Sequence, residues 1–168
     1  MHVADPMLSK INWRIAIVCI AGLTLSIYSF TVELAKERDP FYTAFCDITK
    51  TISCTDVLTS EYSKGFGIFP KSSFFQLHKV PNVIFGIIFF SMMLIVALKN
   101  TYAYSITALT FGIMSLFMSM YLAFILYKLE KICILCVSTY IICMSLTYYC
   151  LQKFRIISSS VAHQRKTQ

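Results

Sequence analysis

Four cysteines, arranged in two pairs, carry the chemistry that this sequence offers most clearly. Cys133 and Cys136 form a Cys-x-x-Cys motif in the segment KICILCVSTY, and Cys46 and Cys54 lie in a polar segment far upstream. Such cysteines can hold zinc, form structural disulfides or act as a redox dithiol. The upstream pair is spaced more widely than the roughly two to four intervening residues of most zinc sites. We therefore expect no metal, and the redox and structural interpretations both stay open.

Composition predicts the elements that position these cysteines. Of the 168 residues, 57% are hydrophobic and 14% are charged, which is typical of a membrane protein. Four apolar stretches have about the length needed to cross a bilayer core, which is about 20 residues. A soluble bundle would need a polar outer layer that so short a chain cannot supply. The stretches cover about residues 11–32, 81–98, 101–127 and 132–152.

We therefore predict an all-α integral membrane protein with a four-transmembrane-helix bundle. The first stretch is longer than the core of a signal peptide and no small-residue cleavage site follows it, so we keep it as a permanent helix. The chain then forms a single membrane domain over residues 1–168. A luminal loop would cover residues 33–80, and a cytosolic tail would cover residues 153–168.

The net charge of +7 indicates membrane topology rather than nucleic-acid binding. Lys10 and Arg14 flank the first span, Lys99 lies between the second and third, and basic residues follow the fourth. An even number of spans puts these sites on one side, which the positive-inside rule makes cytosolic. Both termini are then cytosolic. All four paired cysteines face the opposite compartment, which permits disulfides if it is the lumen of the endoplasmic reticulum.

The Cys-x-x-Cys motif has a specific predicted environment. If the fourth helix begins just before the motif, Cys133 and Cys136 lie in its first turn, where free backbone N–H groups and the helix dipole favour a thiolate. The thiolate is the nucleophilic form of cysteine. Lys128 and Lys131 add positive potential nearby. Tyr140 follows Cys136 by one helical turn and shares its face.

The remaining cysteines lie within apolar spans, where a thiol usually packs as a small hydrophobic side chain. We expect that role for Cys19, Cys143 and Cys150. Cys143 is the exception to watch, because it lies two turns beyond Cys136 on the same helical face.

The loop between the first two spans is polar but rich in aromatic residues. Asp39 and Pro40 are typical of a helix start, so we predict a short helix from there to about Cys46. The segment GFGIF, residues 65–69, either returns to the membrane surface or packs on the helix ends. In both interpretations this loop roofs the luminal mouth of the bundle.

The segments FCDITKTISCTDVLTSEYSKGFGIF, PNVIFG and CILCVSTY, in that order between spans, resemble the vitamin K epoxide reductase family. The resemblance runs from about Ile11 to Lys153. It implies a four-helix bundle in the endoplasmic reticulum membrane, with a central quinone pocket beneath a luminal cap. The dibasic ending RKTQ is similar to an endoplasmic reticulum retrieval signal, which requires a cytosolic tail.

The resemblance also implies roles for individual residues. Cys133 and Cys136 would be the active pair, with Cys136 nearest the quinone, and Cys46 and Cys54 would relay electrons to them. The remaining positions concern the pocket. Leu58 and Tyr62 stand where the vertebrate pattern often has Phe and Trp. These two differences would affect substrate preference and coumarin sensitivity. The substrate-binding set would be Asn82 and Tyr140 as hydrogen-bond donors to the quinone oxygens, Phe85 and Phe89 as lining, Leu58 and Tyr62 as the cap, and Ser60 in support.

The implied function is thiol-dependent reduction of vitamin K 2,3-epoxide and vitamin K quinone to the hydroquinone. Vitamin K is then a substrate, no cofactor is tightly bound, and a dithiol donates the electrons. Expected partners are membrane lipid and thioredoxin-like luminal oxidoreductases of the protein disulfide isomerase type, with the chain itself a monomer. Two alternatives stay open: a disulfide generator for luminal folding that uses ubiquinone or menaquinone, and a non-catalytic four-span scaffold.

Overall fold

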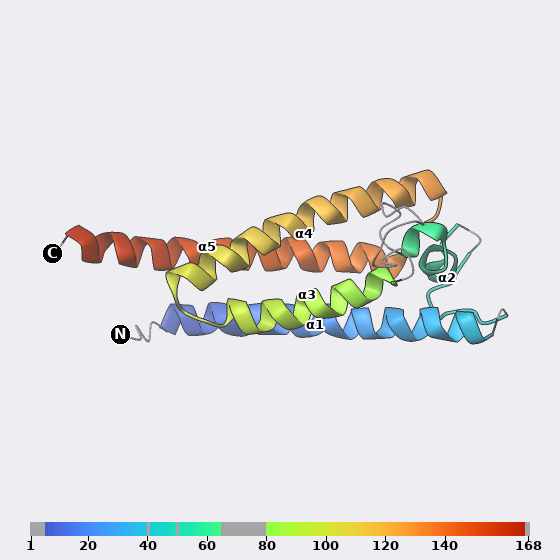
Figure 1. Cartoon of the computed structure of the whole chain (residues 1–168), viewed down its shortest axis with the longest axis horizontal. Helices are drawn as coiled ribbons and strands as arrows, with labels where there is room; N and C mark the ends of the chain where they lie inside the picture. The colour runs from blue at the N-terminus through green and yellow to red at the C-terminus, as the bar shows by residue number, and fades with distance from the viewer. Residues whose placement is uncertain (1–5, 40, 50, 65–79, 167–168) are drawn as a thin grey trace.

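The computed structural model describes residues 6–39, 41–49, 51–64 and 80–166. Almost all of the regular structure is helical, as Figure 1 shows. Two further short elements lie between the first and second long helices. In chain order the elements are α1 (Pro6–Arg38), α2 (Cys54–Leu58), the 3₁₀ helix η1 (Glu61–Ser63), α3 (Asn82–Ala97), α4 (Tyr102–Leu129) and α5 (Ile134–Lys166).

The four long helices pack side by side as a bundle. α1 packs against α3 and α5, and α4 packs against α5 and α3. Both chain ends lie at one end of the bundle, whereas α2 lies at the other (Figure 1). Each of the four apolar stretches of the sequence has formed one of these helices. The described part of the polar segment between the first two of them, residues 39–64 apart from 40 and 50, therefore lies at a single end of the bundle.

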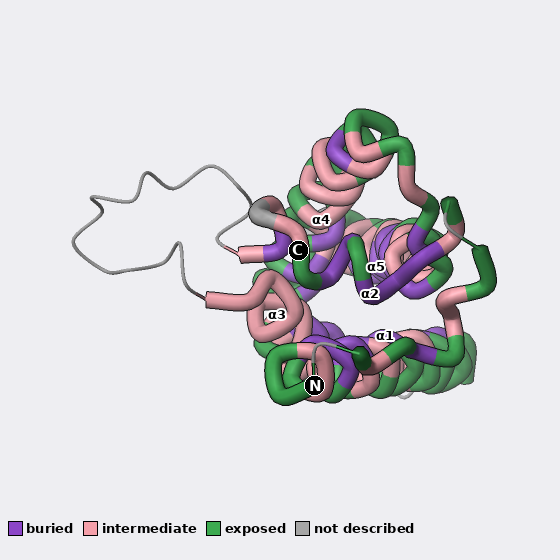
Figure 2. Tube along the Cα trace, turned by 90° about the vertical axis from the view of Figure 1, so that its right-hand side faces the viewer, coloured by how far each residue is buried: buried purple, intermediate pink, exposed green. Residues whose placement is uncertain are grey.

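The outward faces of the helices are apolar, which marks this as a membrane protein. Figure 2 shows buried residues facing between the helices and exposed residues on the outer faces. Large exposed side chains on these faces include Ile17, Ile95, Phe117 and Met144, a surface that suits lipid rather than water. Within the described residues, three helices are long and apolar enough to cross a membrane, namely Pro6–Arg38, Tyr102–Leu129 and Ile134–Ala162. The predicted second span forms the shorter apolar helix α3.

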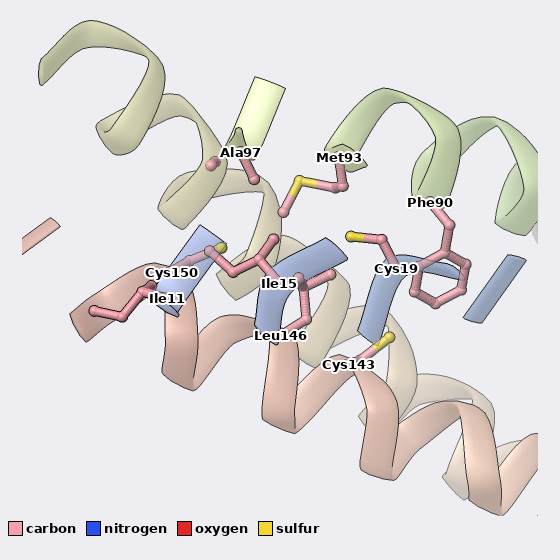
Figure 3. Packing of buried hydrophobic residues seen from close by; sticks show 10 residues of the cluster. Ile11, Ile15, Cys19, Phe90, Met93, Ala97, Cys143, Leu146 and Cys150 are labelled. Carbon is pink, nitrogen blue, oxygen red and sulfur yellow. The ribbon is translucent and has the colours of Figure 1, made fainter. Parts of the chain in front are cut away.

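The centre of the bundle is a close-packed cluster contributed by α1, α3, α4 and α5 (Figure 3). Cys19, Cys143 and Cys150 all belong to this cluster, so the packing role that the sequence predicts for them agrees with their position. The aromatic ring of Phe90 lies directly on Gly22 of α1, where any Cβ would collide with it. The missing side chain at Gly22 therefore allows α1 and α3 to approach closely.

A polar node ties the helices together at the end that carries the termini. The Nζ of Lys153 donates to the carbonyl of Ala97 at 2.6 Å and to Oδ1 of Asn12 at 2.7 Å. Nδ2 of Asn12 donates in turn to Oδ1 of Asn100 at 3.0 Å. The sequence places Lys153 on a tail after the last helix, but α5 continues through Lys166 and buries this lysine. The structure thus corrects that expectation.

The predicted helix from Asp39 to Cys46 is wrong. α1 itself runs to Arg38, and Oδ1 of Asp39 accepts the amide of Phe41 in a turn. In a helix the amide of Ala44 would donate to a backbone carbonyl one turn earlier. Here it donates to the carboxylate of Asp47 instead. The short helix of this loop is α2, which begins one residue after Ser53, whose side chain accepts the amide of Asp56. The GFGIF segment lies outside the described residues.

We predict that Lys153→Ala lowers the stability of the bundle by about 1–3 kcal/mol, because it leaves the buried carbonyl of Ala97 and the partly buried side chain of Asn12 without their donor. The measurement is the apparent unfolding midpoint in detergent micelles. Lys10→Ala, which removes an exposed lysine of α1, is the matched control and should leave the midpoint unchanged. Equal midpoints for the two variants would show that the node contributes nothing.

Candidate functional site

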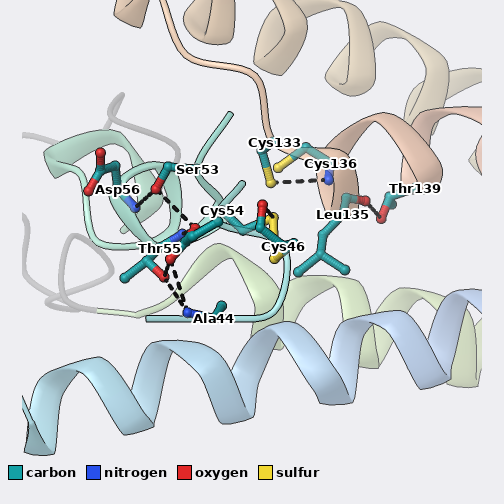
Figure 4. Close-up of a disulfide and its surroundings, with 11 residues drawn as sticks. Ala44, Cys46, Ser53, Cys54, Thr55, Asp56, Cys133, Leu135, Cys136 and Thr139 are labelled. Atoms are coloured by element: carbon teal, nitrogen blue, oxygen red, sulfur yellow. Dashed lines mark hydrogen bonds between the residues drawn. A yellow bond between two sulfur atoms is a disulfide. The ribbon is translucent and has the colours of Figure 1, made fainter. Parts of the chain in front are cut away.

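The two cysteine pairs meet because the loop that carries one of them pairs with the connection between α4 and α5. Ile52 and Ile132 form an isolated parallel bridge. The amide of Ile132 donates to the carbonyl of Thr51 at 2.8 Å, and the amide of Ser53 donates to the carbonyl of Ile132 at 3.1 Å. Cys133 directly follows Ile132, and Cys54 lies two residues after Ile52. The bridge therefore brings the two cysteine pairs, far apart in sequence, into one buried cluster (Figure 4).

The four cysteines differ in exposure and oxidation. Cys46 and Cys54 form a disulfide with a Cα–Cα distance of 5.8 Å. Cys46 is half-buried, whereas Cys54 and Cys133 are both fully buried. Cys133 and Cys136 are free thiols, and Cys136 is partly accessible. Cys46 and Cys136 are thus partly accessible, whereas Cys54 and Cys133 are enclosed.

Cys133 caps the helix that follows it. α5 begins at Ile134, slightly later than the sequence predicts, so Cys133 directly precedes it and Cys136 lies in its first turn. The amide of Cys136 donates to Sγ of Cys133 at 3.3 Å. Hydrogen bonds from the side chain of Cys136 and from backbone amides at the helix start lower the pKa of Cys133, although burial opposes them. These hydrogen bonds therefore favour deprotonation of Cys133.

A cavity of about 400 Å³ opens beside Cys136. Its walls come from α1, α3, α4 and α5, and from α2 and η1 at the loop end. All six residues that the sequence predicts to bind substrate line it, together with Cys136 and Ser60. The six are Leu58, Tyr62, Asn82, Phe85, Phe89 and Tyr140.

The lining of the cavity is mostly apolar, and two of its polar side chains are Tyr140 and Asn82. The hydroxyl of Tyr140 is buried and has no hydrogen-bond partner among the described residues. Nδ2 of Asn82 donates to the carbonyl of Tyr62 at 2.8 Å. Lys64 and Pro81 form an antiparallel bridge that fixes the start of α3 against η1. Asn82 and Tyr62 are thereby held together at the roof.

Sequence reasoning missed the residues of α1 and α4 that line the cavity. They include small hydroxyl residues inside apolar helices, and their orientation toward the cavity depends on the helix rotation, which the sequence does not reveal. Cys143 also lines the cavity, and its position two turns beyond Cys136 on the same face was the available signal. The polar lining residues that were not predicted are Ser26, Ser29, Ser63, Ser115, Ser119, Thr139 and Cys143.

Asp47 organises the loop that holds the disulfide. Its carboxylate accepts the amides of Ala44 and Thr55, each at 3.0 Å, and the hydroxyl of Ser53 at 3.0 Å. The hydroxyl of Thr55 donates to it as well. Burial raises the pKa of Asp47, but these donors outweigh that effect and hold the pKa below its ordinary value. The carboxylate thus links the two halves of the disulfide loop.

Within the described residues, no group of three or more His, Cys, Asp or Glu side chains is arranged to hold a metal ion. The arrangement is instead a chain of sulfur atoms that leads from the loop surface to an apolar cavity. Such a chain can move two electrons by thiol–disulfide exchange.

We predict that Asp47→Ala speeds hydrogen exchange at the amides of Ala44 and Thr55 by about tenfold or more, since hydrogen bonds to charged groups contribute about 1.5–3 kcal/mol each. Asp56→Ala is the control, because its exposed pair with Lys131 contributes little.

The same carboxylate predicts a pH dependence. Because the folded pKa of Asp47 lies below its ordinary 3.8, its stabilisation is complete above that value and is lost as the pH falls through the lower folded pKa. Loop exchange that is insensitive to acid over this window would contradict the role of Asp47.

Comparison with known proteins matches this arrangement to one family. A family model described as "Vitamin K epoxide reductase family" matches residues 13–151. The "Vitamin K epoxide reductase complex subunit 1" of Mus musculus is 36% identical over 139 residues, covering 81% of this chain and 86% of the relative. Its counterpart from Rattus norvegicus is 35% identical over the same shares. With its apolar helix bundle and its cysteine pairs beside a cavity, the chain belongs to the vitamin K epoxide reductase family of membrane oxidoreductases.

Proposed function

We propose that this protein reduces vitamin K 2,3-epoxide and vitamin K quinone to the hydroquinone, using a dithiol as electron donor. The observation that carries the proposal is the position of Cys136, the only one of the four paired cysteines that lines the described cavity. A lipid-soluble quinone can reach such a cavity from the membrane, while reducing equivalents arrive at Cys46 from water. The relatives named for vitamin K epoxide reduction support the same substrate.

The inner pair carries the chemical step. Cys136 passes its proton to Cys133 as its sulfur adds to a ring carbon of the quinone and forms a C–S bond. Cys133, whose lowered pKa favours the thiolate, then attacks the sulfur of Cys136. The S–S bond forms, the C–S bond breaks, and the electron pair passes to the ring. The two thiol protons end on the ring oxygens, giving hydroquinone. With the epoxide, the same two thiols yield the quinone and water.

Asn82 and Tyr140 are the proposed donors to the two ring oxygens. Both line the cavity, and the hydroxyl of Tyr140 is buried without a hydrogen-bond partner in the described part of the chain. A donor aimed into a dry cavity stabilises charge that develops on an oxygen during the reaction. Phe85 and Phe89 line the wall from α3, and Leu58 and Tyr62 close the loop end. The cap residues thus contribute to substrate preference.

The outer pair recharges the inner one. The thiolate of Cys54 attacks Cys133 of the oxidised inner disulfide and releases Cys136. Cys46 then attacks Cys54 and releases Cys133, which is a good leaving group because its pKa is low. This closes the Cys46–Cys54 disulfide, which is the state of the structure. A dithiol protein outside the membrane must reopen it.

The proposed setting is the endoplasmic reticulum membrane, with the disulfide loop in the lumen and both termini in the cytosol. All four long helices would cross the membrane. The position of both chain ends at one end of the bundle supports an even number of crossings. The basic residues flanking the first span and following the fourth support a cytosolic location for that end.

We predict that Cys136→Ala abolishes turnover of vitamin K epoxide and of plain quinone with every reductant. Cys46→Ala should retain turnover with a small membrane-permeant dithiol, which can reach the inner pair directly, but lose it with a protein donor. Quinone formation is followed by absorbance in lipid nanodiscs. Cys150→Ala, which removes a thiol of the central cluster, is the control. Full activity of Cys136→Ala would end this mechanism, and turnover of plain quinone without epoxide would favour the disulfide-generating alternative.

We further predict that Tyr140→Phe lowers kcat by about 10²-fold, since loss of one donor to a developing oxyanion typically costs about that much. Tyr148→Phe removes an exposed hydroxyl from the same helix and should have no effect. Single-turnover measurements after full reduction of the inner pair isolate the chemical step. Equal rates for the two variants would remove Tyr140 from the reaction.

A further inference from the structure

The loop that carries the outer disulfide exposes three large apolar side chains. The exposed fractions are 91% for Phe41, 98% for Phe45 and 65% for Ile48. Phe45 directly precedes Cys46, and Ile48 follows it by two residues. We call these three side chains the loop patch. The proposed quinone reaction does not use them.

The loop backbone holds the patch in place. The amide of Asp47 donates to the carbonyl of Ala44 at 3.0 Å, and the amide of Ile48 donates to the carbonyl of Ile52 at 3.0 Å. Ala44 itself is buried. The residues between the exposed side chains therefore anchor the loop inward, and the exposure of Phe45 belongs to an ordered turn. An ordered, exposed aromatic side chain is available for a partner without a large ordering cost.

The position of the patch argues against burial in lipid. The continuous apolar part of α1 ends at Val32, because Glu33 follows it, and the helix continues through Arg38 with charged residues in its final turns. At about 1.5 Å per residue this carries the chain about 9 Å beyond the apolar part of α1 before the loop begins. The bridge between Ile52 and Ile132 then holds the loop over the end of the bundle. The patch thus lies at the water-facing end.

We propose that the loop patch is the docking surface for the thioredoxin-like protein that reduces the Cys46–Cys54 disulfide. The inference rests on the proposed function, because only a recharging cycle requires such a donor. A donor that forms a mixed disulfide with Cys46 must bring its own surface against the adjacent Phe45. Apolar and aromatic side chains at the centre with a polar rim are typical of protein interfaces. Here exposed Thr43, Thr49 and Thr51 provide neutral hydroxyls in the same loop.

The redox step balances within this complex. A thiolate of the donor attacks Sγ of Cys46, the Cys46–Cys54 bond breaks, and Cys54 leaves as a thiolate that takes up a proton. The second donor thiol then attacks the first donor sulfur and releases Cys46 as a thiol. The donor is oxidised to a disulfide, and Cys46 and Cys54 together gain two electrons and two protons. Docking must hold the donor only for these two exchanges, which suits a small apolar patch.

The test compares two reductants in nanodiscs that contain the full chain. Dithiothreitol needs no docking surface, whereas the isolated first domain of a protein disulfide isomerase does. Phe45→Ser should raise KM for the protein donor about tenfold or more, as truncation of an interface anchor does, and leave the rate with dithiothreitol unchanged. Tyr127→Ser removes an aromatic side chain that is 83% exposed on α4 and is the matched control. An unchanged KM, or an equal loss with both reductants, would overturn the docking surface.

A second measurement does not depend on quinone turnover. In the Cys54→Ala variant, free Cys46 attacks a donor domain whose single active-site cysteine carries thionitrobenzoate, and the released thionitrobenzoate is followed by absorbance. Adding Phe45→Ser should slow this release about tenfold; Cys46→Ala gives the background. An unchanged release rate would refute the patch. If the unaltered protein did not reduce quinone with dithiothreitol, the proposed function would be contradicted. The release assay would still test whether the loop patch binds the donor.

Lipid is the competing occupant, and fluorescence distinguishes it. Trp13 is the single tryptophan of the chain, so Trp13→Phe combined with Phe45→Trp places one reporter in the patch. Brominated lipids should leave its emission unquenched, whereas addition of the donor domain should shift it. Strong quenching by the lipids would show that the patch inserts into the membrane and would overturn the proposal.

Discussion

The pairing between Ile52 and Ile132 is the constraint on which the proposed chemistry depends. Two backbone hydrogen bonds from this bridge hold the disulfide loop on the connection between α4 and α5. The ion pair between Asp56 and Lys131 joins the same two segments, but the bridge sets the backbone alignment of Cys54 and Cys133. Backbone pairing suits this task because it fixes register as well as proximity, and register decides which sulfur faces which. Side-chain packing alone would tolerate a shift by one residue.

The same bridge makes the site directional. Burial increases from Cys46 to Cys54 and Cys133, and the cavity begins only at Cys136. An external thiol therefore meets the outer sulfur first, and a ring in the cavity meets the inner one. The buried sulfurs between them are shielded from both water and substrate. In the proposed function, this separation would keep an aqueous reductant from reacting directly with a lipid-soluble oxidant.

Much of this arrangement could be predicted from the sequence, for physical reasons that differ between regions. The helices were predictable because apolar stretches of that length have few alternatives, and the residues assigned to the substrate all line one cavity. The loop helix was misplaced because Asp39 and Pro40 carry a strong local signal, whereas the observed fold depends on Asp47 recruiting amides from both halves of the loop. Hydrogen bonds from distant residues to one carboxylate leave no periodic pattern in the sequence. Burial of Lys153 was invisible for the same reason, since its acceptors come from α1 and α3.

The length of α3 has a consequence for the surrounding lipid. Its 16 residues give a rise of about 24 Å, less than the about 30 Å of a typical hydrocarbon core. Its two ends are fixed by polar groups, Asn82 at one and the ammonium of Lys153 at the other. As a crossing helix it would produce a hydrophobic mismatch on one side of the bundle, relieved by local thinning of the bilayer. Membrane thickness would then bear on which organelle retains the protein, in favour of thin, sterol-poor membranes.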